Sequence, residues 1–293
     1  MFEARKLAVK ADSTWGLIGI PLLVLIFSTV VLQAVLAPAI QLVLPISESD
    51  PVTSGSTVMM ILSVLISFVV MMKVGKLSRE DLGLTSSGVF GAIARGLIGG
   101  FIAITLTTLA IKLLGGVTIE YVFKPEYLST LLLGVVFFAF QGTYEELIYR
   151  SYLMPHLSKK LGDIGGILLS SVLFVLLHAM NPGITVVPVI NLFLASIVFS
   201  LIYYLTGNLW LVGVAHGIWN YAQGFFYGSL VSGNALSETV FKSLPVEGKD
   251  LISGGSFGFE GGIITSLLGL IVIGLTFAAI KKQRNKAQPL VAA

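Results

Sequence analysis

The chain has 293 residues, of which 55% are hydrophobic and only 11% are charged. Because soluble domains carry roughly 25% charged residues, this composition predicts a polytopic membrane protein and argues against a soluble enzyme. The net charge is +3, and the basic residues are not clustered with aromatic ones, so we expect no nucleic-acid partner. The absence of cysteine excludes disulfides, thiolate catalysis and cysteine-bound metals.

Eight apolar runs follow one another along the chain, and a helix that spans a bilayer needs about 20 residues. We expect transmembrane helices at 15–44, 58–72 with a few flanking residues, 90–114, from 128 onwards, 164–180, 184–205, 208–227 and 263–280. The first run is too long for a cleaved signal peptide. Glycines at 96, 99 and 100 predict close packing of the third helix. The predicted fold class is therefore all-α.

Lys and Arg residues are distributed unevenly between the two sides of the membrane that eight helices define. The N-terminus, the 73–87 connector, the 150–160 region and the C-terminus hold thirteen of them, and the opposite loops hold three. Those opposite loops also hold eight of the fifteen acidic residues. Under the positive-inside rule we expect both termini to be cytoplasmic.

The fourth apolar run leads into a polar stretch that contains Glu145, Glu146 and Arg150. An ionisable group inside a membrane segment is expensive and marks a candidate functional site. On a helix, Glu146 and Arg150 share a face, and Glu145 points about 100° away from Glu146. The alternative is a helix end that emerges from the lipid with solvated charges.

Two further polar pairs fall within the apolar runs. If the chain turns at 158–163, Glu146 and His178 each lie sixteen residues from Gly162 and are level, roughly 24 Å from the turn. Pro155 is expected to kink the helix. His216 and Asn220 are four residues apart and share a helix face; a structural polar seam is the alternative. We interpret His156 as a residue of the membrane interface.

This set of side chains suits the hydrolysis of an amide bond. A carboxylate or a histidine activates water, and imidazole and amide donors stabilise the tetrahedral oxyanion. The buried positive charge of Arg150 needs a counter-charge, which Glu146 is placed to supply. The chain has no Gly-x-Ser-x-Gly elbow, no His-Glu-x-x-His motif and no phosphate-binding loop.

Three motifs occur in order within residues 128–222: Glu145-Glu146-x-x-x-Arg150, Phe174-x-x-x-His178 and His216-x-x-x-Asn220. Together they resemble the motifs of the CPBP intramembrane proteases, also called the CAAX prenyl protease 2 or Abi family. The resemblance implies an all-helical membrane fold that encloses a cavity, and proteolysis of membrane-associated peptides. With the eight apolar runs, we expect about eight transmembrane helices around an intramembrane polar cavity. Some members trim prenylated C-termini, and bacterial members are linked to bacteriocin processing or self-immunity.

On this basis we divide the chain into three parts. Residues 1–127 form an N-terminal region with three transmembrane helices, and 128–228 form a CPBP-like catalytic core with four. Residues 229–293 hold a polar, Gly-rich loop, the last helix and a basic cytoplasmic tail. The expected partners are the lipid bilayer and a peptide or protein substrate, which is lipidated in part of the family.

We assign provisional roles within the site. Glu145 has no basic residue at i+3 or i+4 and is the candidate general base, whereas Glu146 neutralises Arg150. His178 is expected to share the catalytic water, and His216 and Asn220 to stabilise the oxyanion.

A divalent metal is a second option for the chemistry, because His and carboxylate are ordinary zinc ligands. Glu145, His178 and His216 would then be the ligands. We favour a water mechanism without metal, because no short spacing such as His-x-x-x-His occurs.

Two other classes of function remain open. One is a non-catalytic bacteriocin-immunity or membrane binding protein that keeps the motifs for structure. The other is an ion- or proton-coupled transporter, for which we expect inverted repeats; no internal repeat is found.

Overall fold

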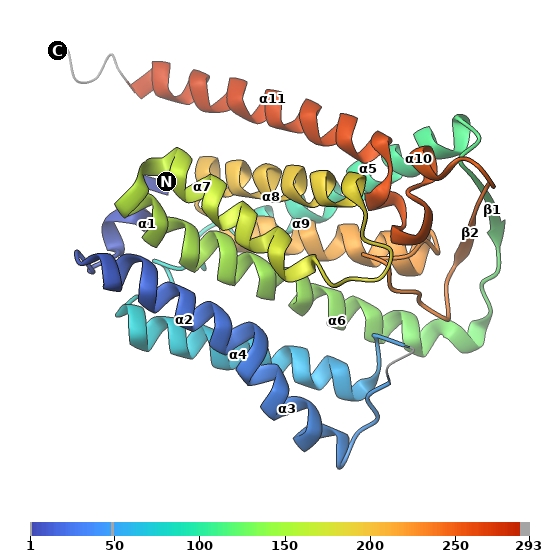
Figure 1. Ribbon diagram of the computed structural model, residues 1–293, viewed down its shortest axis with the longest axis horizontal. Helices are drawn as coiled ribbons and strands as arrows, with labels where there is room; N and C mark the ends of the chain where they lie inside the picture. The colour runs from blue at the N-terminus through green and yellow to red at the C-terminus, as the bar shows by residue number, and fades with distance from the viewer. Residues whose placement is uncertain (1, 48–49, 288–293) are drawn as a thin grey trace.

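A computed structural model of the chain describes residues 2–47 and 50–287, with the side chains of 286 and 287 excepted. Positions 48 and 49, in the connector between the first two expected helices, and the last residues of the basic tail lie outside the described residues. The helices run roughly side by side across the molecule, and long helices that follow one another along the chain run in opposite directions (Figure 1).

All eight expected segments are helical, with ends shifted by a few residues. The first is continuous through η1 (Trp15–Gly19), α2 (Ile20–Ile26), η2 (Phe27–Val31) and α3 (Leu32–Gln41), after a short α1 (Phe2–Ala8). The others are α4 (Ser54–Gly75), α5 (Val89–Leu113), α6 (Leu128–Glu146), α7 (Met154–His178), α8 (Val186–Thr206), α9 (Leu209–Tyr221) and α11 (Ile263–Ala287). The predicted all-α class is confirmed.

By length and apolar composition, six helical segments of the described chain are able to cross a membrane. One of them, Pro125–His178, has 54 residues and contains the expected turn. Gly162 breaks its helix with φ 77° and ψ 165°, a conformation that glycine adopts without steric cost. This segment therefore folds into two helices, and α9 with η5 (Ala222–Phe226) forms a shorter helix beside them.

The helix is π-helical where α6 meets α7, over η4 (Leu147–Leu153). Single π-helical turns are rare and often occur at functional sites. The sequence predicted only a kink at Pro155, which instead lies in the first turn of α7. The interfacial interpretation of His156 is wrong, because this residue is only 3% exposed and its Nδ1 lies 2.7 Å from the carbonyl oxygen of Tyr152.

A small antiparallel sheet, which the sequence analysis did not predict, closes one end of the helices. Strand β1 (Val117–Tyr121) pairs with β2 (Phe241–Pro245), and Val117 lies opposite Pro245. A short helix, α10 (Asp250–Ser253), and the 3-10 turns η6 (Gly255–Phe257) and η7 (Phe259–Gly261) complete this end, at the right of Figure 1. The segment 229–262, expected as a polar, Gly-rich loop, therefore contains a strand and short helical turns.

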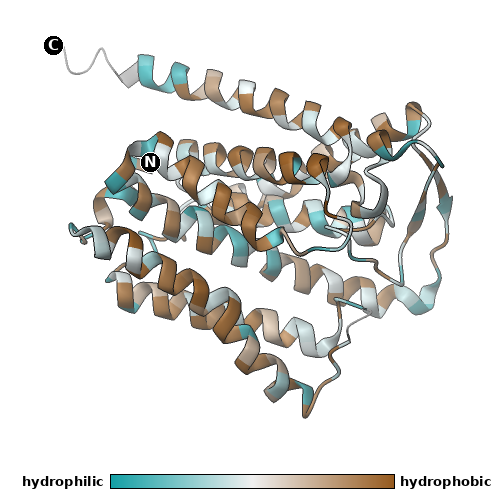
Figure 2. Ribbon diagram, viewed as in Figure 1, coloured by the Kyte–Doolittle hydropathy of each residue, from teal (hydrophilic) through white to brown (hydrophobic). Residues whose placement is uncertain are grey.

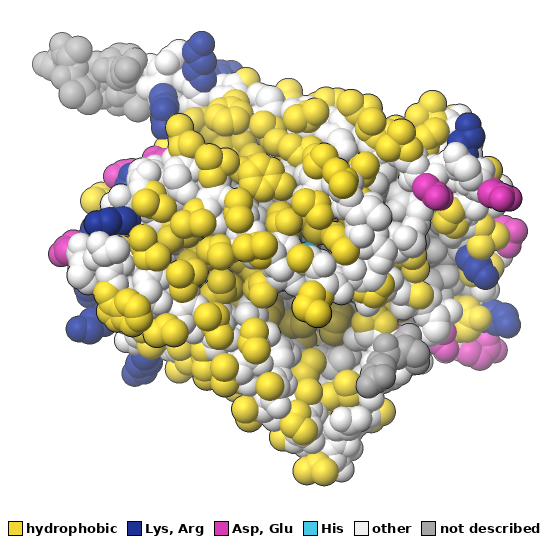
Figure 3. Space-filling view, in the orientation of Figure 1, with side chains coloured by type: hydrophobic (Ala, Val, Ile, Leu, Met, Phe, Trp, Pro, Cys, Tyr) yellow, Lys and Arg dark blue, Asp and Glu magenta, His cyan; other side chains and the backbone are white. Residues whose placement is uncertain are grey.

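Hydrophobic residues occupy much of the middle of the helices, and polar residues concentrate towards their ends (Figure 2). Many large apolar residues are exposed, for example Leu65 at 52% and Leu132 at 59%, as expected where lipid replaces water. On the face drawn in Figure 3, Lys and Arg side chains lie at both ends, more of them at the end that holds the termini, and most acids lie at the end with the sheet. The charges follow the sorting that the sequence predicted.

Close packing of α6 against α9 positions the polar residues. A Cβ atom added at Gly142 would lie 2.8 Å from the carbonyl oxygen of Gly213 and would overlap the backbone of Gly217. Small residues thus let these two helices approach closely. The same reasoning holds for Gly96 and Gly100 of α5, which face the α9 backbone, whereas Gly99 faces open space.

Candidate active site

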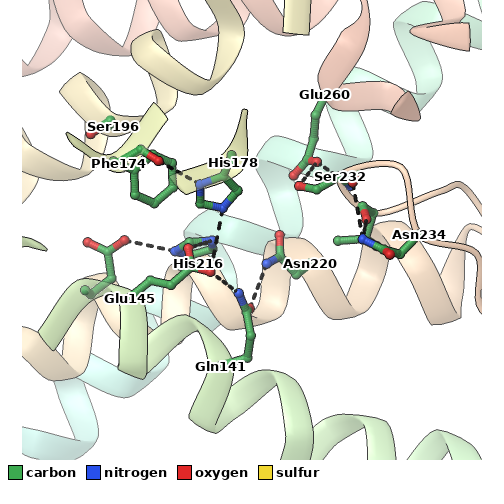
Figure 4. Close-up of polar contacts among 12 residues, drawn as sticks. Gln141, Glu145, Phe174, His178, Ser196, His216, Asn220, Ser232, Asn234 and Glu260 are labelled. Carbon is green, nitrogen blue, oxygen red and sulfur yellow. Dashed lines mark hydrogen bonds and ion pairs between the residues drawn. The ribbon is translucent and has the colours of Figure 1, made fainter. Parts of the chain in front are cut away.

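The expected polar residues meet in one place, between α6, α7 and α9 (Figure 4). Glu145 and Glu146 end α6, and Arg150 lies in η4. His178 is the last residue of α7, and His216 and Asn220 lie on α9. The hairpin reasoning that placed His178 level with the glutamates is therefore confirmed.

The inner cluster consists of Glu146, Arg150, Ser196 and His216. Glu146 and Arg150 are fully buried, and Nη1 of Arg150 lies 2.9 Å from Oε1 of Glu146, which confirms the expected ion pair. Nη2 of Arg150 donates to the carbonyl and hydroxyl oxygens of Ser196, at 3.2 and 2.9 Å. Nδ1 of His216 lies 2.9 Å from the same Oε1 of Glu146. The buried charges are thus paired and hydrogen-bonded.

Aromatic rings enclose the inner cluster. The guanidinium of Arg150 lies 4.7 Å from the ring centroid of Phe174 and 5.7 Å from that of Phe199, within the range of cation–π attraction. The ring of Phe199 stacks on His216 at 4.9 Å, and that of Phe174 lies 4.4 Å from His178. These rings restrict the orientation of both imidazoles.

The cavity cluster consists of Gln141, Glu145, His178 and Asn220. Nε2 of Gln141 donates to Oε1 of Glu145 at 2.6 Å, and Nδ2 of Asn220 donates to Oε1 of Gln141 at 2.9 Å. Oε1 of Glu145 is 3.8 Å from Nε2 of His178. Its Oε2 is 3.7 Å from Nε2 of His216, the residue that links the two clusters. One carboxylate is therefore fixed by an amide and faces two imidazoles.

The hydrogen-bond partners define the tautomers of both histidines. Nδ1 of His178 lies 2.8 Å from the carbonyl oxygen of Phe174, which can only accept, so this nitrogen carries the proton. Nδ1 of His216 donates to the Glu146 carboxylate for the same reason. In their neutral forms, both rings therefore direct the lone pair of Nε2 towards Glu145, where it can accept a proton from water.

Sequence reasoning missed Gln141 as a member of the site. It lies four residues before Glu145 on α6, so the shared helix face was visible in the sequence. An uncharged amide in a membrane helix does not stand out as an ionisable group does. In the structure Gln141 connects α6 to α9, because it is hydrogen-bonded to both Glu145, the candidate base, and Asn220, the candidate oxyanion donor.

A cavity of about 740 Å³ adjoins the cavity cluster, a size typical of small-molecule and peptide sites. Its apolar lining includes Phe137, Phe138 and Trp219. The face drawn in Figure 3 is hollowed, and a histidine side chain shows between hydrophobic ones near this hollow. Glu260 and Ser232, from the loop before α11, also line the cavity, and no motif in the sequence indicated them.

Within residues 2–47 and 50–287, no group of three or more His, Cys, Asp or Glu residues has the arrangement of a metal site. The proposed ligands do converge: the carboxylate oxygens of Glu145 are 3.7–3.8 Å from Nε2 of the two imidazoles. This spacing accommodates either a bridging water or a metal ion, and elemental analysis distinguishes the two.

Comparisons with known proteins agree with the motifs. Residues 127–222 match the family model described as Rce1-like, type II CAAX prenyl endopeptidase. The matched segment extends from the residue before α6 to the first residue of η5, so it contains every residue of the two clusters. No curated protein and no solved structure matches the chain. The resemblance to the CPBP proteases is confirmed.

Proposed function

From the match of residues 127–222 to the Rce1-like, type II CAAX prenyl endopeptidase family model, we propose that this chain cleaves membrane-associated peptides with a water activated by Glu145. The family supports an intramembrane endopeptidase in general. One observation carries the finer assignment: Glu145 faces two imidazoles across 3.7–3.8 Å at the wall of the cavity, while Glu146 is enclosed with Arg150.

In the proposed first step, a water binds between Glu145 and His178. Separations above about 3.5 Å between polar groups suit a bridging water. The water donates one proton to the Glu145 carboxylate and its other hydrogen bond to Nε2 of His178. Its oxygen then attacks the carbonyl carbon of the substrate. Gln141 holds the base in place through its hydrogen bond to Oε1.

The oxyanion that forms needs donors. The side-chain amide of Asn220 has two N–H groups, and one of them donates to Gln141, so the other is available to the substrate oxygen. In the proposed mechanism His216 is the imidazolium, protonated at Nε2 from solvent before the substrate binds; it donates through Nδ1 to Glu146 and through Nε2 to the oxyanion, and it keeps both protons. Collapse of the intermediate breaks the C–N bond, and protonated Glu145 returns its proton to the leaving amine.

The substrate class follows from the surroundings of the site. The cavity is lined mainly by apolar side chains, and the surface around the hollow in Figure 3 is hydrophobic. We infer that the peptide approaches from the membrane. A C-terminal lipid is compatible with this route, as the family description suggests, and its presence on the substrate is part of the proposal.

Purified protein and a library of hydrophobic peptides test the proposal. We expect defined cleavage products by mass spectrometry, with lipidated peptides compared against unlipidated ones of the same sequence. Binding without any product would favour a non-catalytic immunity or binding protein.

We also propose that the reaction needs no metal. If elemental analysis of active protein finds stoichiometric zinc and its removal abolishes cleavage, that part of the mechanism is wrong. Glu145, His178 and His216 would then be the ligands to test.

We further propose that both termini are cytoplasmic. Reporter fusions at Lys242 and Lys282 are expected to report opposite sides of the membrane. A report of the same side at both positions would contradict this orientation.

A further inference from the structure

The mechanism leaves one acidic residue of the cavity unused. Glu260, in η7, lines the same cavity as Glu145, His178 and His216. Figure 4 shows its side chain extending from the loop before α11 towards the region of His178 and Asn220, with Ser232 beside it. A substrate in this cavity therefore meets the carboxylate of Glu145 at the catalytic end and that of Glu260 at the loop end.

The loop holds Glu260 firmly. The backbone N–H and the hydroxyl of Ser232 both donate to Oε2 of Glu260 at 2.9 Å. The main-chain oxygen of Glu260 accepts from Nδ2 of Asn191 at 2.7 Å, which fastens the loop to α8. Gly258 takes φ 89° and packs so closely on Leu230 that a Cβ atom would overlap its carbonyl oxygen. The position of the carboxylate is therefore fixed before any ligand binds.

No Lys or Arg of the described chain pairs with this carboxylate. Glu260 forms no ion pair among the described residues, and its Oε1 makes no hydrogen bond there. Burial raises the pKa of Glu260 above its usual value, while the hydrogen bonds from Ser232 and the nearby His216 and His178 lower it. Arg95 is the one Lys or Arg among the described lining residues, but it lies in the second turn of α5, and its Nε donates to the oxygen of Gly91.

A fixed, partly desolvated carboxylate without a partner is costly unless a ligand supplies the counter-charge. We propose that Glu260 forms a subsite for a basic side chain, lysine or arginine, of the peptide that enters the catalytic cavity. The ammonium or guanidinium donates to Oε1 while Ser232 keeps Oε2 in place. This inference rests on the proposed function, because it takes the ligand to be the substrate.

Binding without turnover tests the subsite. The probes are short Ala/Leu-rich peptides, acetylated and amidated at their ends, in which a single lysine moves along the sequence, each matched to a peptide with glutamine at that position. Dissociation constants are measured with the full-length Glu145→Gln protein, which is expected not to cleave. At one position or a few adjacent ones, we expect lysine to bind about tenfold to a hundredfold more tightly than glutamine.

The double variant Glu145→Gln/Glu260→Gln is expected to bring that ratio close to one. Its amide oxygen still accepts from Ser232, so the loop is retained while the charge is removed. A matched control, Glu247→Gln, changes an exposed acid of the same region and is expected to leave the ratio unaltered. Glutamate-containing peptides give the converse: they should bind poorly when Glu260 is present and recover in the double variant.

The outcomes separate this inference from the proposed function. An equal preference for lysine with and without Glu260, or no preference at any position, overturns the subsite even if wild-type protein cleaves the peptides. If the lysine preference depends on Glu260 but wild-type protein cleaves none of the peptides, the subsite stands and the protease assignment is refuted.

Discussion

The inner cluster and the cavity cluster lie side by side, but they differ in how the charges of their side chains are paired. In the inner cluster, Arg150 is matched by Glu146 and bonded to Ser196. In the cavity cluster, Glu145 has one amide donor, and two imidazoles lie beyond hydrogen-bond distance. In the inner cluster the two opposite charges neutralise each other, although Oε2 of Glu146 and Nε of Arg150 have no hydrogen-bond partner among the described residues. The cavity cluster faces open space and has capacity left for water and substrate.

This difference arises from the directions in which two adjacent side chains point. Glu145 and Glu146 are adjacent on α6, and their side chains point about 100° apart on a helix. One direction faces the core around Arg150, and the other faces the cavity. We therefore propose unequal roles for the two glutamates, and variants of the two clusters are expected to fail in different measurements.

The largest expected effect on stability is in the inner cluster. Glu146→Gln removes the counter-charge of buried Arg150, and breaking such a pair costs about 3–5 kcal/mol. Thermal unfolding of the purified variant in detergent is expected to show this loss. Glu247→Gln, at an exposed position, serves as the control and is expected to stay within about 0.5 kcal/mol of wild type. A fully stable Glu146→Gln would mean that the ion pair does not hold the helices.

Asn220→Ala in the cavity cluster is expected to lower kcat with little change in KM. Removal of one oxyanion donor costs about 2.7–4 kcal/mol where it has been measured, or a hundredfold to a thousandfold in kcat. Steady-state kinetics on a cleaved peptide measure the two parameters separately. Asn220→Asp keeps the size but loses the donor, so an Asp variant with wild-type kcat would remove Asn220 from the oxyanion site.

A smaller effect is expected for Gln141→Met. This change preserves the size of the side chain and removes its hydrogen bonds to Glu145 and Asn220. A hydrogen bond to a charged group contributes about 1.5–3 kcal/mol, and water can replace part of it, so we expect a loss of about tenfold in kcat and unchanged unfolding. If kcat is unaffected, Gln141 does not position the base.

The sequence predicted the helical segments and the convergence of the polar residues because both depend on local signals. Apolar runs of bilayer length locate helices, and ionisable residues within them stand out. Equal distances from Gly162 placed Glu146 and His178 at one level. The close contacts of Gly96 and Gly100 with α9 were likewise predictable, because small residues permit close approach of two helices.

The features that were missed depend on contacts between distant parts of the chain. The pairing of β1 with β2 joins segments more than a hundred residues apart, and neither strand has a distinctive pattern. The place of Glu260 in the cavity depends on Ser232 and Asn191, which lie on other elements. The burial of His156 follows from how α7 packs, because the residue alone suits an interface equally well.

Turnover and unfolding of Glu145→Gln, measured beside Glu146→Gln, test the central claim most directly. The account predicts that Glu145→Gln unfolds at about the wild-type temperature and has almost no turnover, because it loses the base and keeps the inner cluster. It also predicts that Glu146→Gln unfolds at a clearly lower temperature. An active Glu145→Gln protein beside a stable, inert Glu146→Gln protein would contradict the account and reverse the two roles.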